Sequence, residues 1–534
     1  MGRGRRRSSV ARASSSTARS SPATPVRSCV RRRQRRRPQR VFPSPPRNRV
    51  STISPTERDD PGEPLPPLHR GGLDRLVGWF ATAEKPRARF RVGTEHEKFG
   101  FLYPAPGDDP ARPIPLPYDG SRGIEALLQA IAADRDDTAA HGPWTAATDS
   151  GHTIALFRGD ASITLEPGGQ FELSGAPFSS LHETQREIDE HVTLLARLCR
   201  PRRIGFVGLG FQPTATWGEM PLVPKGRYAV MTRYMPTVGK RGLDMMKRTA
   251  TVQANYDWSS EADMIASYQT ALVVAPLVAA LFANSPFVQG RPSGALSERQ
   301  QVWADTDPQR AGFPAAILAR DFSYERYVQW VLDVPMYFVR RDGLHHDVAG
   351  ASFRTFLAEG IDIDGAPVRA TLRDFADHLT TLFPEVRLKR VLEVRSADST
   401  PPARLAALPA LYKGLLYDER ARDRARALMD GATATELAAL RADVAVRGFA
   451  ATFRGQSILS RCGDLVHEAG AGLARLAVKN AGGEDEGVYL RPLQDVVASG
   501  RTFAEHLLER YATTWGGSLA PLWDEAAYWR TAAG

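Results

Sequence analysis

Two glutamates stand two positions apart in a segment, Phe90–Phe101, that has the composition of a strand. Side chains two positions apart on a strand project from the same face, so Glu95 and Glu97 point the same way. Neighbouring carboxylates repel each other unless a positive charge lies between them, and Mg²⁺ prefers such oxygen ligands. The pair therefore indicates either a magnesium site or a solvated strand edge on which Glu and Lys are mixed.

A second acidic pattern surrounds the sequence Pro-Gly-Gly at positions 167–169. Thr164 and Glu166 share one strand face before it, and Gln170 and Glu172 share one after it. If Pro-Gly-Gly makes a tight reversal, the two pairs face the same side. An ordinary exposed hairpin and a metal-binding cleft are both compatible with this pattern.

A third pattern lies in the segment Phe383–Asp398, where Glu393 and Arg395 project together from a predicted strand. A carboxylate for a metal ion beside a guanidinium for phosphate is the pairing that phosphoryl transfer uses, because charge develops on the phosphate oxygens. The alternative is a simple salt bridge between strands.

Polar and basic side chains follow Pro224. Lys225, Arg227 and Arg233 form a basic cluster that either binds substrate carboxylates or is a solvated loop. Gln253 and Asn255 lie on one face of another predicted strand and can add neutral contacts to a nucleotide or a carboxylate.

Several common nucleotide and hydrolase motifs are absent from the sequence. It contains no GxxxxGK[ST] loop, no GxGxxG opening a βα unit and no GxSxG elbow. The glycines of Gly205–Gly210 have a different spacing and indicate close backbone packing or a bulge. A Walker-type ATP site is therefore not expected.

Composition indicates a soluble globular protein, with 42% hydrophobic and 24% charged residues. Residues 1–56 contain 16 Arg and no Lys, Asp or Glu, so the remainder has a net charge of −6 although the whole chain has +10. Nucleic acid is therefore not expected as a partner of the body of the chain. No apolar run is long enough to span a membrane. The three cysteines show no metal-ligand spacing, and this sparse use of cysteine favours a reduced, intracellular setting.

The chain is expected to form a disordered Arg/Ser/Pro-rich tail, residues 1–66, and one catalytic domain, residues 67–534. Hydrophobic periodicity predicts helices in four segments: Leu73–Ala83, Leu181–Cys199, Ala262–Ala283 with Pro276 as a possible kink, and Thr433–Ala445. It predicts strands in six: Phe90–Leu102, His152–Glu166, Gln170–Leu173, Ile204–Phe211, Val252–Trp258 and Leu388–Arg395. Without regular βαβ alternation, these elements predict an α+β fold with an antiparallel sheet.

Six motifs, in this order, resemble those of the plant-type glutamate–cysteine ligases, a family also found in many bacteria: GTEHEKFGF, LEPGGQFELSGAP, VPKGRY, LFANSPF, LDVPMY and FPEVRLKR. The resemblance covers about residues 72–530. It implies a glutamine-synthetase-like fold, in which a curved antiparallel sheet forms an active-site funnel surrounded by helices, with a helical C-terminal part.

The resemblance also implies roles for individual residues. Expected metal ligands are Glu95, Glu97, Glu166, Glu172 and Glu393. Arg395, with Gln253 and Asn255 beside it, is expected at the ATP phosphates, and Arg395 and Glu393 are the expected catalytic pair. Substrate carboxylates are assigned to Arg233, Arg299, Lys225 and Arg227. Ala250 and the absence of Cys in 361–368 argue against the regulatory disulfides of the plant members.

The implied reaction uses ATP and Mg²⁺ to join the γ-carboxylate of glutamate to the amine of cysteine through γ-glutamyl phosphate, the first step of glutathione biosynthesis. Three alternatives stay open: a related ligase with another amine acceptor or serving ergothioneine synthesis, a non-catalytic glutamate or nucleotide sensor, and a nucleic-acid-binding protein driven by its tail. The enzyme is expected in the cytoplasm as a monomer or homodimer, or in a plastid if residues 1–66 are a transit peptide. The tail could equally be a translated upstream sequence.

Overall fold

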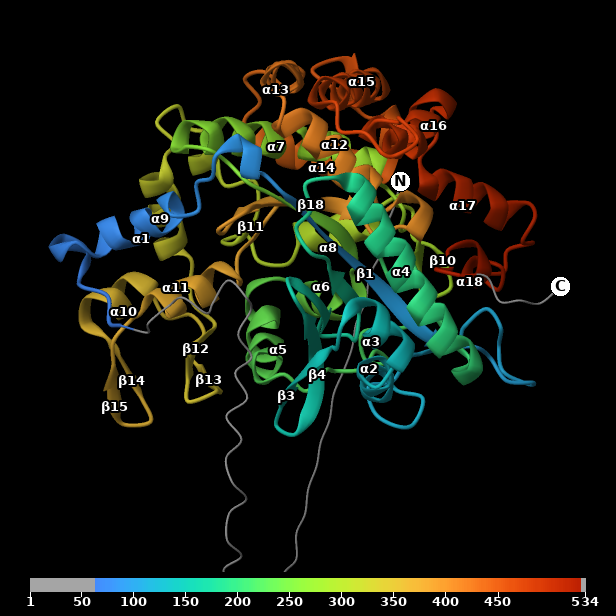
Figure 1. Ribbon diagram of the computed structural model, residues 1–534, viewed down its shortest axis with the longest axis horizontal. Helices are drawn as coiled ribbons and strands as arrows, with labels where there is room; N and C mark the ends of the chain where they lie inside the picture. The colour runs from blue at the N-terminus through green and yellow to red at the C-terminus, as the bar shows by residue number, and fades with distance from the viewer. Residues whose placement is uncertain (1–62, 530–534) are drawn as a thin grey trace, which may run out of the picture. The chain divides into compact units, whose positions relative to one another are not determined.

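The computed structural model describes residues 63–529, which are organised around one antiparallel sheet of ten strands (Figure 1). Eight strands follow one another across the sheet: β17 (Val386–Leu388), β18 (Leu392–Asp398), β8 (Thr251–Tyr256), β1 (Val92–Leu102), β6 (Phe171–Ser174), β5 (Ala161–Leu165), β4 (His152–Arg158) and β3 (Thr145–Asp149). Two more, β2 (Ile114–Pro115) and β7 (Ile204–Val207), pair with the second half of β1. The long central strand β1 therefore joins every part of the sheet.

Helices surround this sheet. Those before residue 400 are α1 (Gly72–Ala81), α2 (Ile124–Ala132), α3 (Arg135–His141), α4 (Leu181–Cys199), α5 (Gly226–Val238), α6 (Gly242–Arg248), α7 (Glu261–Leu281), α8 (Glu298–Ala304), α9 (Tyr324–Asp333), α10 (Phe353–Glu359) and α11 (Leu372–Leu379). The C-terminal helices are α12 (Ala407–Leu416), α13 (Glu419–Ala427), α14 (Ala434–Arg447), α15 (Ile458–Leu476), α16 (Arg491–Ser499), α17 (Phe503–Ala512) and α18 (Leu522–Glu525).

Short two-stranded ribbons complete the fold. They are β9–β10 (Phe287–Val288 with Arg291–Pro292), the parallel pair β11–β16 (Ala311–Gly312 with Phe383–Pro384), β12–β13 (Phe338–Arg341 with Leu344–Asp347), β14–β15 (Ile361–Ile363 with Ala366–Val368) and β19–β20 (Thr452–Phe453 with Gln456–Ser457). An antiparallel sheet, surrounding helices and a helical C-terminal part confirm the predicted α+β class.

The reverse face of the sheet packs on helices, because alternate residues of each strand are apolar. The helices α7 and α12 pack against β18 and β8 on this face, where the Tyr256 hydroxyl donates to Pro409 O on α12 at 3.0 Å. The helix α4 lies along β1, and the His96 and His191 rings meet edge to face. Lys98 is fully buried on this side, with Nζ 5.3 Å from the Phe171 and Tyr528 ring centroids.

The helix α7 is long and apolar enough to span a membrane. It is, however, a core helix of this fold, because 89% of its most apolar stretch is buried. Ser260 caps it by accepting from the Asp263 N–H, and Pro276 lies inside it. The helix predicted for Ala262–Ala283 is therefore confirmed as α7, and most of it is buried.

Two predicted strands are each divided by a turn. The segment His152–Glu166 forms β4 and β5 with a reversal at Gly159, whose φ of +57° suits glycine. The segment Leu388–Arg395 spans the turn between β17 and β18, where the Lys389 N–H donates to Val391 O at 2.9 Å. In both places an alternating pattern continues across the turn, so the sequence looked like one strand.

The predicted strand Ile204–Phe211 is also shorter, since β7 ends at Val207. The next residues leave the sheet where another segment crosses closely. A Cβ on Gly208 would lie 2.2 Å from the Thr400 backbone, and one on Gly210 would lie 2.3 Å from the Asp398 carboxyl carbon. These glycines therefore serve close backbone packing, as their spacing suggested.

The start of the packed chain reaches into the predicted tail. The Leu65 N–H donates to Ala370 O at 2.7 Å, and Leu65 is buried. Residues 1–62 lie outside the described residues, so the disorder predicted for 1–66 stays a prediction there. Cys199 and Cys462 are both free and buried.

Candidate active site

Four glutamates converge on the face of the sheet opposite α4, called the front face below. Glu95 and Glu97 project from β1, and Glu97 lies opposite Glu172 of β6 in the strand register. Glu166 follows β5 in the Pro-Gly-Gly hairpin, where its N–H donates to Gln170 O at 3.0 Å. Electrostatic repulsion links Glu166 to both Glu97 and Glu172. The sequence prediction that these carboxylates face one side is confirmed.

Two members of this group, Glu97 and Glu172, have raised pKa values. Burial and then repulsion by Glu95 and Glu166 raise the pKa of Glu172 to about 8. Burial and then repulsion by Glu166 and Glu172 raise the pKa of Glu97 well above its ordinary value. Carboxylates packed this closely must share protons or a cation. An all-oxygen donor set on one face fits a hard divalent ion such as Mg²⁺.

Neutral groups of β8 orient these carboxylates. Asn255 Nδ2 donates to Glu95 Oε1 at 2.6 Å, and Gln253 Nε2 donates to Glu97 Oε1 at 3.4 Å. The Thr251 N–H donates to Glu97 Oε2 at 3.0 Å. Both amides predicted from the sequence therefore lie on the front face, where they contact carboxylates.

Glu393 has a different environment from the other glutamates. It is fully buried on β18, opposite Arg387 of β17, whose Nε and Nη2 donate to its two oxygens at 2.5 and 2.9 Å. Burial alone would raise the pKa of Glu393, but Arg387, Lys389 and Arg395 outweigh it and hold the pKa well below its ordinary value. Its charge is therefore compensated within the protein.

Sequence reasoning missed Arg387. The signal was present, because a hairpin turn between Leu388 and Leu392 places Arg387 directly opposite Glu393. The sequence placed Thr164 on the same strand face as Glu166 but indicated no role for its hydroxyl. Its hydroxyl donates to Glu172 Oε2 at 2.5 Å and so fixes that carboxylate.

Arg395 extends across the front face from β18. Its Nη1 donates to Gln253 Oε1 at 2.7 Å and lies 3.4 Å from Glu393 Oε1. Arg299 of α8 is buried, and its Nη2 donates to Arg395 O at 2.8 Å. A cavity of about 10 Å³ lies beside these two arginines, lined by Arg299, Gln300, Trp303, Phe383, Pro384, Glu385 and Arg395.

The basic cluster predicted after Pro224 divides between two places. Lys225 Nζ donates to Leu165 O at 2.7 Å, next to the hairpin that holds Glu166, and burial followed by the Arg227 charge lowers the pKa of Lys225 to about 7. Arg227 lies over the Tyr228 ring at 5.1 Å. Arg233 is exposed, and its Nη2 donates to Asp347 Oδ2 on β13 at 2.7 Å. Its role in substrate binding stays a prediction.

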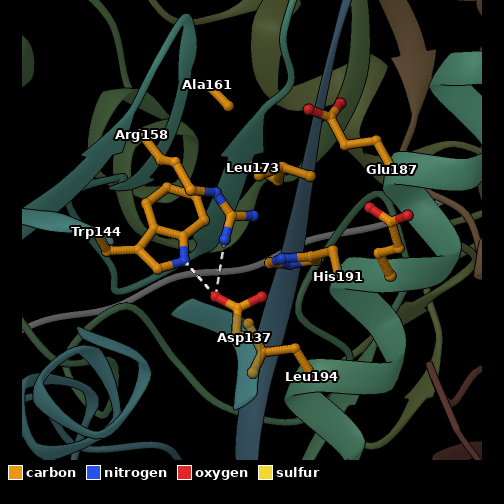
Figure 2. Close-up of a pocket in the computed structure, with 9 residues that line it drawn as sticks. Asp137, Trp144, Arg158, Ala161, Leu173, Glu187, His191 and Leu194 are labelled. Carbon is orange, nitrogen blue, oxygen red and sulfur yellow. Dashed lines mark hydrogen bonds and ion pairs between the residues drawn. The ribbon is translucent and has the colours of Figure 1, made fainter. Parts of the chain in front are cut away.

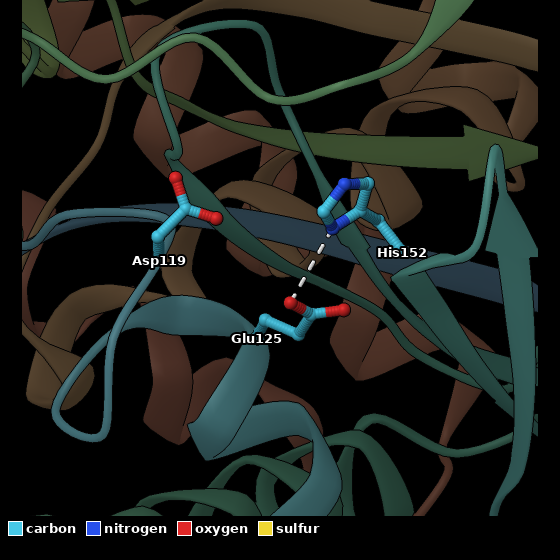
Figure 3. Close-up of side chains that lie close together, drawn as sticks. All are labelled: Asp119, Glu125 and His152. Carbon is cyan, nitrogen blue, oxygen red and sulfur yellow. Dashed lines mark hydrogen bonds and ion pairs between the residues drawn. The ribbon is translucent and has the colours of Figure 1, made fainter.

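Two other polar groups lie away from the front face. Behind the sheet, a cavity of about 20 Å³ has room for one or two waters and is lined by residues that include Asp137, Arg158, Glu187 and His191 (Figure 2). Asp119, Glu125 and His152 bring potential metal-ligand atoms within 4.8 Å of one another (Figure 3). None of the residues predicted for the active site belongs to either group.

Comparison with known proteins gives a consistent result. The family model described as glutamate–cysteine ligase family 2 (GCS2) matches residues 91–525. "Glutamate–cysteine ligase A, chloroplastic" of Oryza sativa subsp. indica is 42% identical over 93% of this chain and 96% of its own length. The chloroplastic glutamate–cysteine ligases of Solanum lycopersicum and Arabidopsis thaliana are 43% and 42% identical, each over 85% of this chain and 82% of their own length.

Among solved structures, a glutamate–cysteine ligase of Francisella tularensis in complex with AMP aligns with 81% of this chain and 86% of its own, with 10% identity and a TM-score of 0.48. The match of the family model to most of the chain and the identity to the plant enzymes confirm the prediction from the motifs, and the chain belongs to glutamate–cysteine ligase family 2.

Proposed function

We propose that this enzyme uses ATP to join the γ-carboxylate of glutamate to the amino group of cysteine, giving γ-glutamylcysteine for glutathione biosynthesis. The observation that carries the proposal is the convergence of Glu95, Glu97, Glu166 and Glu172 on the front face, next to Arg395. Phosphoryl transfer needs such a place, where negative phosphate oxygens meet cations and donors.

The front-face carboxylates would hold Mg²⁺, which neutralises phosphate charge when it is bound. The role of the chain is to fix the donor oxygens in advance. Asn255, Gln253 and the Thr251 N–H orient Glu95 and Glu97 through the hydrogen bonds described above. Preorganised donors lower the barrier because they do not need to reorganise during the reaction.

Glu393 and Arg395 form the proposed catalytic pair. Arg387 donates to both oxygens of Glu393, so this carboxylate has a fixed orientation. The guanidinium of Arg395 is held between Gln253 and Glu393, with its remaining N–H groups available for phosphate oxygens. Both groups are thus oriented before substrate binds.

The chemistry proceeds in two balanced steps. A γ-carboxylate oxygen of glutamate attacks the γ-phosphorus of ATP and ADP leaves, which forms γ-glutamyl phosphate. The cysteine amine then attacks the acyl carbon, phosphate leaves and the amine loses a proton. Lys225, Arg227 and Arg299 add positive charge near the front face for the substrate carboxylates. Arg233 would have to exchange Asp347 for a substrate to take part.

Product analysis tests the proposal. The full-length protein is incubated with glutamate, cysteine, ATP and Mg²⁺. We expect γ-glutamylcysteine, ADP and phosphate to form in equal amounts. Hydroxylamine in place of cysteine should trap the acyl phosphate as a hydroxamate. Turnover with a different amine in preference to cysteine would favour the related ligase, and nucleotide binding without any hydroxamate would favour the sensor.

The place of action is a further part of the proposal. The relatives are named chloroplastic, which supports the plastid alternative for this chain, and none of these names supports the cytoplasmic one. Import of the full-length protein into isolated chloroplasts, with cleavage of its N-terminal segment, is the expected result. Light scattering of the purified protein would distinguish monomer from homodimer.

A further inference from the structure

The strand that presents Arg395 has an irregular register. Between the pairs Val394↔Ala254 and Ala397↔Val252, the two residues Arg395 and Ser396 lie opposite the single residue Gln253. Two residues facing one define a β-bulge, which bends its strand and redirects side chains. Because a bulge leaves backbone groups outside the ladder, these groups need other partners.

The Arg395 N–H donates to Glu385 O at 3.1 Å, and one short segment supplies partners for the two carbonyls. At the bulge, Arg299 Nη2 donates to Arg395 O at 2.8 Å, and Gln300 Nε2 donates to Ser396 O at 2.6 Å. Just beyond it, the Ser297 hydroxyl donates to Asp398 Oδ1 at 2.9 Å. The segment 297–300 thus holds three successive parts of the irregular strand.

The side chain of the extra residue is also held. The Ser396 hydroxyl donates to Glu385 Oε2 at 2.8 Å, and Arg441 Nη1 of α14 donates to Glu385 Oε1 at 2.6 Å. Glu385, Arg441 and Gln300 are all buried. The bulge therefore has a defined geometry that is fixed from two helices.

We propose that Gln300 is a positioning residue for the ligase reaction: by holding Ser396 O it sets the bulge and so the direction in which Arg395 presents its guanidinium. The inference rests on the proposed function, in which Arg395 contacts the phosphoryl group. Gln300 acts through its Nε2, which donates to the Ser396 backbone carbonyl. A misplacement of about 1 Å at a reacting centre can lower the rate about a hundredfold.

The test uses Gln300→Met, which removes the amide but keeps the length of the side chain. The matched control is Gln301→Met, because the side chain of the neighbouring Gln301 donates to Ala442 O, at 3.5 Å, away from the bulge. We expect Gln300→Met to lower kcat at least about tenfold, with KM for cysteine changed less than twofold and Tm close to the parent value. The control should retain the parent kcat.

A double variant distinguishes positioning from general damage. If Gln300 acts through Arg395, then Gln300→Met combined with Arg395→Met should be no slower than Arg395→Met alone. The inference would be overturned if the two substitutions lowered kcat independently, so that their effects multiplied in the double variant. It would also be overturned if Gln300→Met left kcat unchanged. Should Gln300→Met fold poorly, Ser396→Ala, which releases the bulge from Glu385, must show the same non-additivity. A parent protein that forms no product overturns the proposed function as well, whereas an active parent with an unaffected Gln300→Met overturns the inference only.

Discussion

The acidic front face should make the stability of the metal-free protein depend on pH in an unusual direction. Glu172 has a pKa of about 8 in the folded protein, against 4.5 for an ordinary glutamate. Between these values the folded protein holds a proton that the unfolded chain has released. The contribution of Glu172 to the free energy of unfolding is therefore fully present below pH 4.5 and falls as the pH rises towards 8. A salt-bridged carboxylate with a lowered pKa behaves in the opposite way.

The size of the effect follows from the same two pKa values. A shift of one pKa unit corresponds to about 1.4 kcal/mol. Between pH 5.5 and pH 8.0 the Glu172 contribution should decrease by about 3 kcal/mol in EDTA. Mg²⁺ binds the ionised group and only the folded state, so at a hundred times its dissociation constant it should restore about 2.7 kcal/mol at pH 8.0.

Urea denaturation at the two pH values, with EDTA or with Mg²⁺, measures this difference. In Glu172→Gln the decrease in EDTA should be smaller by about 3 kcal/mol than in the parent. Glu359→Gln, which changes an exposed glutamate at the end of α10, is the matched control and should behave as the parent. Equal pH slopes in the parent and Glu172→Gln would refute the electrostatic reasoning.

Three other outcomes are expected. Arg387→Met should lower the free energy of unfolding by about 3–5 kcal/mol in denaturant titrations, because it leaves the buried Glu393 charge without its guanidinium partner. Combining it with Glu393→Gln should recover part of this loss. Glu393→Gln alone should lower kcat by at least about a hundredfold while the circular dichroism spectrum is retained, and near-normal turnover would remove Glu393 from the mechanism. In a Cys29→Ser background, neither Cys199 nor Cys462 should react with a thiol reagent at pH 8 until urea unfolds the protein, because both are buried and burial raises both thiol pKa values, to about 12 for Cys199.

The front face was predictable because strand alternation is a local property. Once Glu95 and Glu97 lie on a strand, their common direction follows from the pleat. The Pro-Gly-Gly sequence likewise predicted a reversal next to Glu166. What the motifs added was the expectation that these separate segments meet in one sheet.

The missed features depend on contacts between distant segments. The bulge at Arg395 is fixed by Gln300 and Glu385, and no spacing in the strand sequence reveals an extra residue. The exposed pairing of Arg233 with Asp347 depends on where the ribbon β12–β13 folds back onto α5. Local patterns set which face a side chain occupies, whereas docking of remote helices sets its final partner.

The central strand β1 places opposite chemistry on its two sides, with Glu95 and Glu97 in front and His96 and Lys98 behind. Because the pleat repeats every two residues, loss or gain of one residue before Glu95 would exchange the two sets. A lysine and a histidine would then enter the front face, and two carboxylates would lie against the aromatic core. A single-codon deletion ahead of Glu95 within β1 should therefore abolish folding and catalysis together.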